Sequence, residues 1–420
     1  MNTTIFKSKL LQSFSVYIGS TVLNSAIPFF LLPVFTKYLT PEDYGYVSLF
    51  TVVNSFLLPL IGFSSIGSVS REYFNQKEIN FSKILGNTII LYLFSIPLLL
   101  ITLLILSQFS NSFGIPKIIL FYGFTFSIFA FLTNAFLAVW QASSKSKGYG
   151  LFQISNTLLN ATLSLLLVVA FLKGYKGRII AQVITSLIFG FIAILLIHKF
   201  HKIQLVYDIK YIKKILRFSL PLIPHSLGAV IISLSDRLFI SKMVGLEMTG
   251  LYSIGFTIGS IIGFIEHSFN MAYMPWLFEN LNKNNLKIKL KIVKITYAYF
   301  LLILLLALFL WLLSPFLFTL IDSAYAEGQK FVFWIALSFA FSGMYKMVTN
   351  YLFFVNKTGI LASITFTCAI LNMILNYFLI KYVGAIGAAI SAAIVSFIFF
   401  ITTWIYSSSK YEMPWGLTKK

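Results

Sequence analysis

Long, mostly apolar runs dominate the chain. Four of them, at 84–106, 179–197, 295–313 and 385–405, are each about as long as a helix that crosses a bilayer. A spanning helix needs about 20 apolar residues, whereas a membrane-barrel strand needs only about 10 with strict alternation. The runs show no alternation of apolar and polar residues. The pattern therefore predicts an all-α bundle of membrane-spanning helices.

Clusters of charge and breaks at Pro, Gly and Asn divide the chain into twelve predicted spans. No segment between them is long enough to fold outside the membrane. The first apolar stretch is too long for the core of a cleavable signal, so we expect it to be retained as a span. The predicted spans are 10–36, 44–69, 83–107, 117–140, 150–172, 178–198, 216–241, 249–275, 294–319, 331–355, 359–380 and 385–407.

Composition narrows the class of protein. Hydrophobic residues make up 58% of the 420 residues and charged residues only 10%, whereas a soluble domain carries about 25% charged residues. So little charge cannot cover a globular surface, which excludes soluble enzymes, soluble repeat scaffolds and disordered proteins. The single cysteine, Cys368, can form neither an internal disulfide nor a cysteine metal cluster, and we expect it to be a small buried residue.

The distribution of Lys and Arg predicts the orientation. If the N-terminus lies in the cytoplasm, 22 of the 32 basic residues fall in cytoplasmic segments and 8 in segments on the other side. Cytoplasmic loops carry the excess of Lys and Arg in membrane proteins. We therefore expect both termini and the segment 199–217 to be cytoplasmic, which fits an even number of spans.

Two basic segments, 199–217 and 283–294, alternate basic and apolar residues. Each is predicted to be an amphipathic helix at the membrane interface. The net charge of +20 is therefore attributed to contact with anionic lipid headgroups, and we expect no nucleic-acid partner.

The two halves of the chain share a residue pattern. Lys37, Glu42, Gly45 and Ser48 recur as Lys242, Glu247, Gly250 and Ser253, and Gly174, Gly177, Ile180, Ile184, Ser186, Ile188 and Phe189 recur as Gly384, Gly387, Ile390, Ile394, Ser396, Ile398 and Phe399. An even number of spans per half makes this a parallel repeat. It predicts six-helix halves at 1–200 and 201–420, related by a pseudo-two-fold axis around a central cavity, with transport by alternating access.

Several motifs together resemble the polysaccharide-flippase family that translocates lipid-linked O-antigen repeat units. They are Pro221-x-x-Pro224, Ser235-Asp236-Arg237, Thr249-Gly250-Leu251-Tyr252, the YLTPEDYG turn at 38–45, and Gly384-x-x-Gly387-Ala388-Ala389. The resemblance implies the multidrug, oligosaccharidyl-lipid and polysaccharide exporter fold in a bacterial inner membrane. It also implies an undecaprenyl-pyrophosphate-linked oligosaccharide as substrate, and a polysaccharide polymerase and a chain-length regulator as partners.

Cations far from loops are candidates for binding a pyrophosphate, because an unpaired charge in the membrane is costly. Lys346 lies well inside the tenth span, and Arg237 lies far along the seventh. Arg71 ends the second span, where it would meet the phosphate first. For each there is a plainer alternative: Lys346 reaches the headgroups, Arg237 lies at the outer interface, and Arg71 is an ordinary cytoplasmic anchor.

Amides and acids within spans complete the candidate site. Asn156 with Asn160, and Asn372 with Asn376, each share one helix face. These pairs could bind sugar hydroxyls or join helices.

Asp236, Glu266 and His267 also lie within spans. They could serve ion coupling or pair with cations. Neighbours on a helix point about 100° apart, so Asp236 and Arg237 are not expected to neutralise each other.

Two other functions remain as alternatives. A cation-coupled multidrug antiporter of the same fold would favour an acidic cavity, whereas this chain is basic. A membrane-embedded polysaccharide polymerase would favour a large catalytic loop or an acidic metal-binding pair, and neither is found in the sequence. A Walker A pattern is also missing, so we expect no ATP hydrolysis, no cofactor and no enzyme activity.

Overall fold

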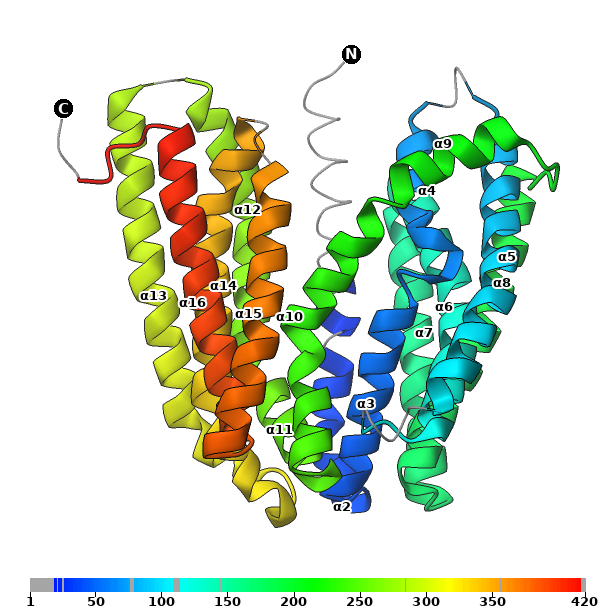
Figure 1. The fold of residues 1–420 in the computed structure, drawn as a ribbon, viewed down its shortest axis with the longest axis horizontal. Coiled ribbons are helices and arrows are strands. Elements are labelled where there is room, and N and C mark those ends of the chain that lie inside the picture. The colour runs from blue at the N-terminus through cyan, green and yellow to red at the C-terminus, as the bar shows by residue number, and fades with distance from the viewer. Residues whose placement is uncertain are drawn as a thin grey trace. The chain divides into compact units, whose positions relative to one another are not determined.

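The computed structural model describes residues 19–416, apart from 21, 25, 76–78, 109–113, 144, 284, 356 and 358. All regular elements in these residues are helices, which confirms the all-α prediction (Figure 1). Ten of them are long and apolar enough to cross a membrane, and a bent pair adds an eleventh span. The first predicted span, 10–36, lies partly outside the described residues. The described part of the chain therefore forms a polytopic helical protein.

The helices divide into two compact units between Val230 and Ile231. In the first unit, α6 packs against both α3 and α8. Its elements are α2 (Leu32–Tyr38), α3 (Pro41–Leu57), η1 (Ile61–Ser64), α4 (Ile66–Tyr73), α5 (Phe81–Gln108), α6 (Lys117–Ala142), α7 (Ser146–Leu165), the π-helical turn η3 (Leu166–Ala170), α8 (Gly174–His201), α9 (Ile209–Ser219) and the first turns of α10 (Leu222–Met243).

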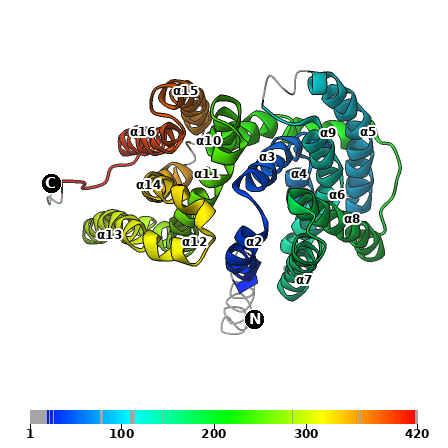
Figure 2. The ribbon, with the colours of Figure 1, turned by 90° about the horizontal axis from the view of Figure 1, so that it is seen from below.

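The second unit is built around α14, which packs against α11, α12, α13 and α16 (Figure 2). Because α14 has neighbours on several sides, much of its surface is buried inside the unit. Cys368 is buried here too, as predicted. The elements after α10 are α11 (Leu246–Gly259), α12 (Ile261–Leu281), α13 (Leu286–Thr319), η4 (Ser323–Gly328), α14 (Gln329–Phe354), α15 (Gly359–Val383) and α16 (Ile386–Lys410).

The second predicted span is not one continuous helix. Its two parts, Pro41–Leu57 and Ile61–Tyr73, meet at a bend of 58°. Pro59 has no amide hydrogen to donate, and Gly62 adopts a left-handed conformation with φ 64°. The Gly62 amide instead donates to Ser95 Oγ of α5 at 2.9 Å. A side chain at Gly62 would collide with the Phe131 ring, so both the backbone conformation and the close packing require glycine here.

The two predicted interfacial helices have different outcomes. In the segment 199–217, α8 continues to His201, an extended stretch follows, and only Ile209–Ser219 forms the amphipathic helix α9. Ile212 and Ile215 are its buried face. The prediction for 283–294 is wrong, because residues from Leu286 are the first turns of the long helix α13 and its backbone bonding continues to Thr319.

Candidate functional site: a polar cavity in the first unit

A polar cavity of about 420 Å³ lies within the first unit, among α3, α6, α7 and α8. None of its lining residues is acidic. They comprise one arginine together with carboxamide, hydroxyl and apolar side chains. The polar ones that matter most are Asn24, Thr133, Asn134, Asn156, Asn160, Arg178 and Gln182.

Arg178 is the one cation of this cavity lining. Its Nη1 donates to Asn160 Oδ1 at 2.8 Å and also to Ser164 Oγ, both on α7. The guanidinium carbon lies 5.0 Å from the centroid of the Phe35 ring. These contacts hold the guanidinium in place without neutralising its charge.

The turn between α7 and α8 sets the position of Arg178. Gly174 begins α8 with φ 55°, and the Tyr175 amide donates to the Asp43 carboxylate of α3 at 3.2 Å. Asp43 also accepts from the Thr40 amide at 3.0 Å in a capping box, so it ties the start of α3 to the start of α8. Arg178 follows one turn later and faces α7.

The sequence prediction did not select Arg178, which is the first residue of the predicted span 178–198, as a candidate site residue. A signal was present in the spacing. Arg178, Gln182, Thr185 and Ser186 recur at helical intervals and form one polar face of α8, and all four line the cavity.

The predicted pair Asn156 and Asn160 does line this cavity. Asn160 binds Arg178, whereas Asn156 makes no hydrogen bond to another described residue. Thr133 of α6 adds a buried hydroxyl that likewise has no partner in the described part of the chain. Buried polar groups in proteins are normally paired with protein or water. The cavity therefore presents unused hydrogen-bonding capacity beside a fixed positive charge.

Arg237 has a very different environment in the second unit. It is 6% exposed, and its Nη1 lies 3.3 Å from Asp236 Oδ1. Tyr252 donates its hydroxyl to the same carboxylate, and the guanidinium lies 4.1 Å from the Phe256 ring centroid. The expectation that these neighbours would not neutralise each other is wrong, because the long Arg237 side chain curls back to Asp236.

Lys346 is paired as well. Its Nζ lies 2.7 Å from Glu266 Oε1, which joins α14 to α12 and confirms that the acid pairs with a cation of another helix. One turn along, Asn350 donates to Asn270 Oδ1 at 2.9 Å. His267 follows Glu266 on the exposed side of α12.

Asn372 and Asn376 join helices. Asn376 donates to Asn372 Oδ1 at 3.0 Å, and Ser235 of α10 donates to the same oxygen at 3.0 Å. Both asparagines are fully buried. This is the helix-joining geometry of the two that the sequence left open. Whether the pair also binds substrate stays a prediction.

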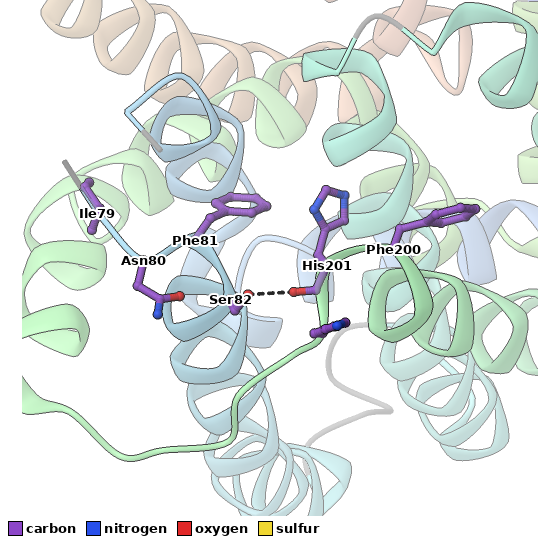
Figure 3. Close-up of a pocket in the computed structure, with 7 residues that line it drawn as sticks. Ile79, Asn80, Phe81, Ser82, Phe200 and His201 are labelled. Atoms are coloured by element: carbon purple, nitrogen blue, oxygen red, sulfur yellow. Dashed lines mark hydrogen bonds between the residues drawn. The ribbon is translucent and has the colours of Figure 1, made fainter. Parts of the chain in front are cut away.

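Arg71 lies at the end of the first unit, outside the lining of the polar cavity. Its side chain is 57% exposed and contacts the Phe218 ring of α9 at 5.0 Å. The neighbouring Glu72 is paired with Lys214 of α9 at 2.9 Å. At the same end, Ser82 donates to the His201 carbonyl at 2.6 Å and joins α5 to α8 (Figure 3).

Comparisons with known proteins agree with this architecture. The family model for "Polysaccharide biosynthesis protein" matches residues 10–281, and that for "MatE" matches 221–378. A protein of the Lsg locus of Haemophilus influenzae is 26% identical over 94% of this chain and 98% of its own. An uncharacterized membrane protein of the same organism is 25% identical over 92% of each chain.

Solved structures show the same fold. An inward-facing multidrug resistance MATE family transporter of the MOP superfamily has a TM-score of 0.75, with 14% identity over 93% of this chain and 94% of the other. The lipid II flippase MurJ in an inward closed conformation has a TM-score of 0.72, with 16% identity over 93% and 86%. With ten helices in the described residues long and apolar enough to cross a membrane, and a bent pair as an eleventh, the protein is a multi-pass membrane protein with the fold of these solved structures. The chain belongs to the polysaccharide biosynthesis protein family.

Proposed function

We propose that this protein is a flippase for an undecaprenyl-pyrophosphate-linked oligosaccharide. It would move the repeat unit from the cytoplasmic to the outer leaflet of a bacterial inner membrane by alternating access, for O-antigen or capsule synthesis. Both termini would lie in the cytoplasm. The observation that carries the proposal is the cavity of the first unit, where Arg178 lies among carboxamides and hydroxyls in a lining that contains no acid.

The chemistry of this cavity fits a pyrophosphate joined to sugars. A phosphate that leaves water needs a replacement for its lost solvation, and the arginine fork suits phosphate oxygens. Both hydrogen bonds of Arg178 to α7 use Nη1, which leaves its Nε and Nη2 donors available. Asn134, Asn156 and Gln182 offer both donors and acceptors to sugar hydroxyls.

The relatives support this proposal without assigning the substrate. The family is described by its role in polysaccharide biosynthesis. One solved protein of the same fold is a flippase for lipid II. A polysaccharide polymerase and a chain-length regulator would be the functional partners, because they act on the translocated unit.

A multidrug antiporter is the competing function, since one solved structure of this fold is a multidrug resistance transporter. A cationic drug would require an acid in its binding site. No acid lines the cavity of the first unit, and the buried acids Asp236 and Glu266 of the second unit are each paired with a cation. The charge pattern thus supports an anionic substrate. The solved proteins of this fold named above are a multidrug resistance transporter and a lipid II flippase, which favours transport over the polymerase alternative.

The decisive experiment replaces Arg178 in a bacterial strain that lacks the native gene. We expect Arg178→Ala to lower surface polysaccharide at least about tenfold per folded molecule, equivalent to a loss of about 1.4 kcal/mol of favourable interaction. Arg178→Lys keeps the charge but loses the fork, and should retain part of the export. Lys176→Ala is the matched control, because this exposed lysine lies two residues away on the same helix.

Membrane abundance and thermal stability are measured with export, so that misfolding is not scored as loss of transport. Normal export by folded Arg178→Ala would contradict the proposal. A second result would also contradict the proposal. It is efflux of a cationic dye by the purified protein in liposomes, combined with unchanged surface polysaccharide in the Arg178→Ala strain, as expected of a multidrug antiporter.

A further inference from the structure

An exposed apolar stretch joins α8 to α9 at one end of the first unit. Residues 202–208 are not helical, and Figures 1 and 2 both show this part of the chain at the outer edge of the unit, beside α5. Apolar side chains project from it, with exposed fractions of 63%, 52%, 66% and 46% for Leu205, Val206, Tyr207 and Ile209. We call these residues the apolar tip.

Gly86 and Asn87 of α5 hold the backbone of this stretch in place. The fully buried Asn87 side chain donates to the Val206 carbonyl at 3.1 Å and accepts from the Asp208 amide at 3.0 Å. Gly86 leaves room for the Gln204 carbonyl oxygen, which would lie 1.7 Å from a Cβ atom at that position. The apolar tip is therefore fixed to the first unit with its side chains directed outward.

Basic side chains flank the apolar tip. Lys214 of α9 is paired with Glu72, and the acid of the stretch, Asp208, caps α9 by accepting from the Lys210 amide at 2.9 Å. The other basic side chains between 202 and 217 are exposed and form no ion pair with another described residue: Lys202, Lys210, Lys213 and Arg217. The surface around the apolar tip thus carries a net positive charge.

The apolar tip continues an apolar surface of the adjoining membrane helix. Leu195 and Phe200 of α8 are 69% and 46% exposed, and α8 is long and apolar enough to cross a membrane. Such side chains on a spanning helix face the acyl chains of lipids. Phe200 lies in the last turn of α8, directly before the stretch that carries the tip. Lipid-facing and tip residues therefore form one band that ends among basic groups.

We propose that the apolar tip inserts into the headgroup region of the adjoining leaflet, and that exposed basic residues of α9 gather anionic phospholipids around it. Interfacial segments bury their apolar side chains about 5–10 Å into the boundary between headgroups and acyl chains. Tyr207 has the amphipathic ring that is enriched at this depth. Lys213 and Arg217 attract the phosphates of an anionic leaflet.

This assignment differs from the expectation for the sequence, which placed one amphipathic helix over 199–217. Insertion belongs to the non-helical apolar tip, and attraction of negative charge belongs to the exposed face of α9. The buried face of α9, with Ile212 and Ile215, is used for packing within the first unit. Because Asn87 ties the tip to α5, the first unit is held at a fixed depth in the leaflet.

A fluorescent label measures the position of the apolar tip. Tyr207→Cys in a Cys368→Ser background is purified as the full chain in lipid nanodiscs and labelled with a nitrobenzoxadiazole dye. A nitroxide on the upper acyl chain of the lipid quenches a dye that is inserted, whereas aqueous iodide quenches a dye that is in water. Asn282→Cys is the reference, because this exposed residue lies in the polar loop between α12 and α13.

We expect the lipid nitroxide to quench the dye at 207, and iodide to quench it about fivefold less than the dye at 282. Asn87→Ala removes both hydrogen bonds to the stretch and should lower quenching by the lipid nitroxide about twofold. Melting temperatures identify labelled proteins that are folded, and the comparison of 207 with 282 does not require the Asn87 variant. Equal iodide quenching at the two positions would refute insertion and leave the tip as a surface for a protein partner.

Selectivity for anionic lipid is measured by changing the lipid that carries the nitroxide. At equal mole fraction, labelled phosphatidylglycerol should quench the dye at 207 about threefold more than labelled phosphatidylcholine. Lys213→Ala combined with Arg217→Ala should make the two lipids equal. Lys287→Ala combined with Lys291→Ala removes the same charge from exposed positions of α13 and should preserve the difference. Equal quenching by both lipids without these substitutions would contradict the recruitment of anionic lipid.

Discussion

The two units each contain an arginine and an asparagine pair on neighbouring helices, yet they use them differently. In the first unit, Arg178 binds Asn160 and lines a cavity without any acid. In the second, Arg237 is buried against Asp236, and Asn372 is hydrogen-bonded to Ser235. A similar set of residue types thus gives an uncompensated charge beside a cavity in one unit and a neutral joint between helices in the other. The difference depends on one nearby carboxylate.

The largest effect is expected from breaking the neutral joint. Arg237→Ala would leave Asp236 buried and unpaired, which should cost about 3–5 kcal/mol of folding free energy. The amount of folded protein in size-exclusion profiles and the melting temperature should both fall sharply. The double variant Arg237→Ala with Asp236→Asn should recover part of the loss, because the buried charge is gone. Arg178→Ala should destabilise less, about 1–3 kcal/mol, since it leaves only neutral groups unpaired.

The second-largest effect is expected from placing a carboxylate beside Arg178 in the first unit, where the cavity lining has no acid. Asn160→Asp has nearly the same shape and would place a carboxylate against the Arg178 guanidinium. We expect folded protein at normal abundance and a fall in polysaccharide export of about tenfold, because the cavity loses its net charge. Asn372→Asp is the counterpart in the second unit, where it should reduce abundance instead. Unchanged export by Asn160→Asp would remove the main distinction between the two units.

The smallest effects are expected from single alanine substitutions in the two asparagine pairs, which should differ in whether they lower stability or export. Asn376→Ala removes its hydrogen bond to Asn372 in a fully buried site and should cost about 1 kcal/mol of stability. Asn156→Ala, in the cavity, should change the melting temperature little and lower export severalfold. Equal stability losses in the two variants would mean that both pairs are structural.

The sequence predicted the helices well because the membrane leaves few options. Every backbone amide in lipid must be bonded within the protein, so long apolar runs become helices. Helical spacing was enough to place Asn156 and Asn160 on one face of α7. These inferences depend only on local periodicity.

The missed features depend on contacts between distant parts of the chain. The bend at Gly62 needs Ser95 and the Phe131 ring of other helices. The role of Arg178 depends on where α8 begins, which Asp43 of α3 helps to set. The pairing of Arg237 with Asp236 depends on how far a flexible side chain can reach, which an argument from helical angles does not include.

The bend between α3 and α4 has a consequence for how the protein enters the membrane. The 17 residues of α3 extend about 26 Å, which is shorter than the hydrocarbon core of about 30 Å, and α4 has only 8 residues. Neither half can span the bilayer alone, and the Gly62 amide between them is satisfied only by Ser95 of α5. We therefore expect stable insertion of this span during synthesis to wait until α5 has emerged from the ribosome and packed beside it.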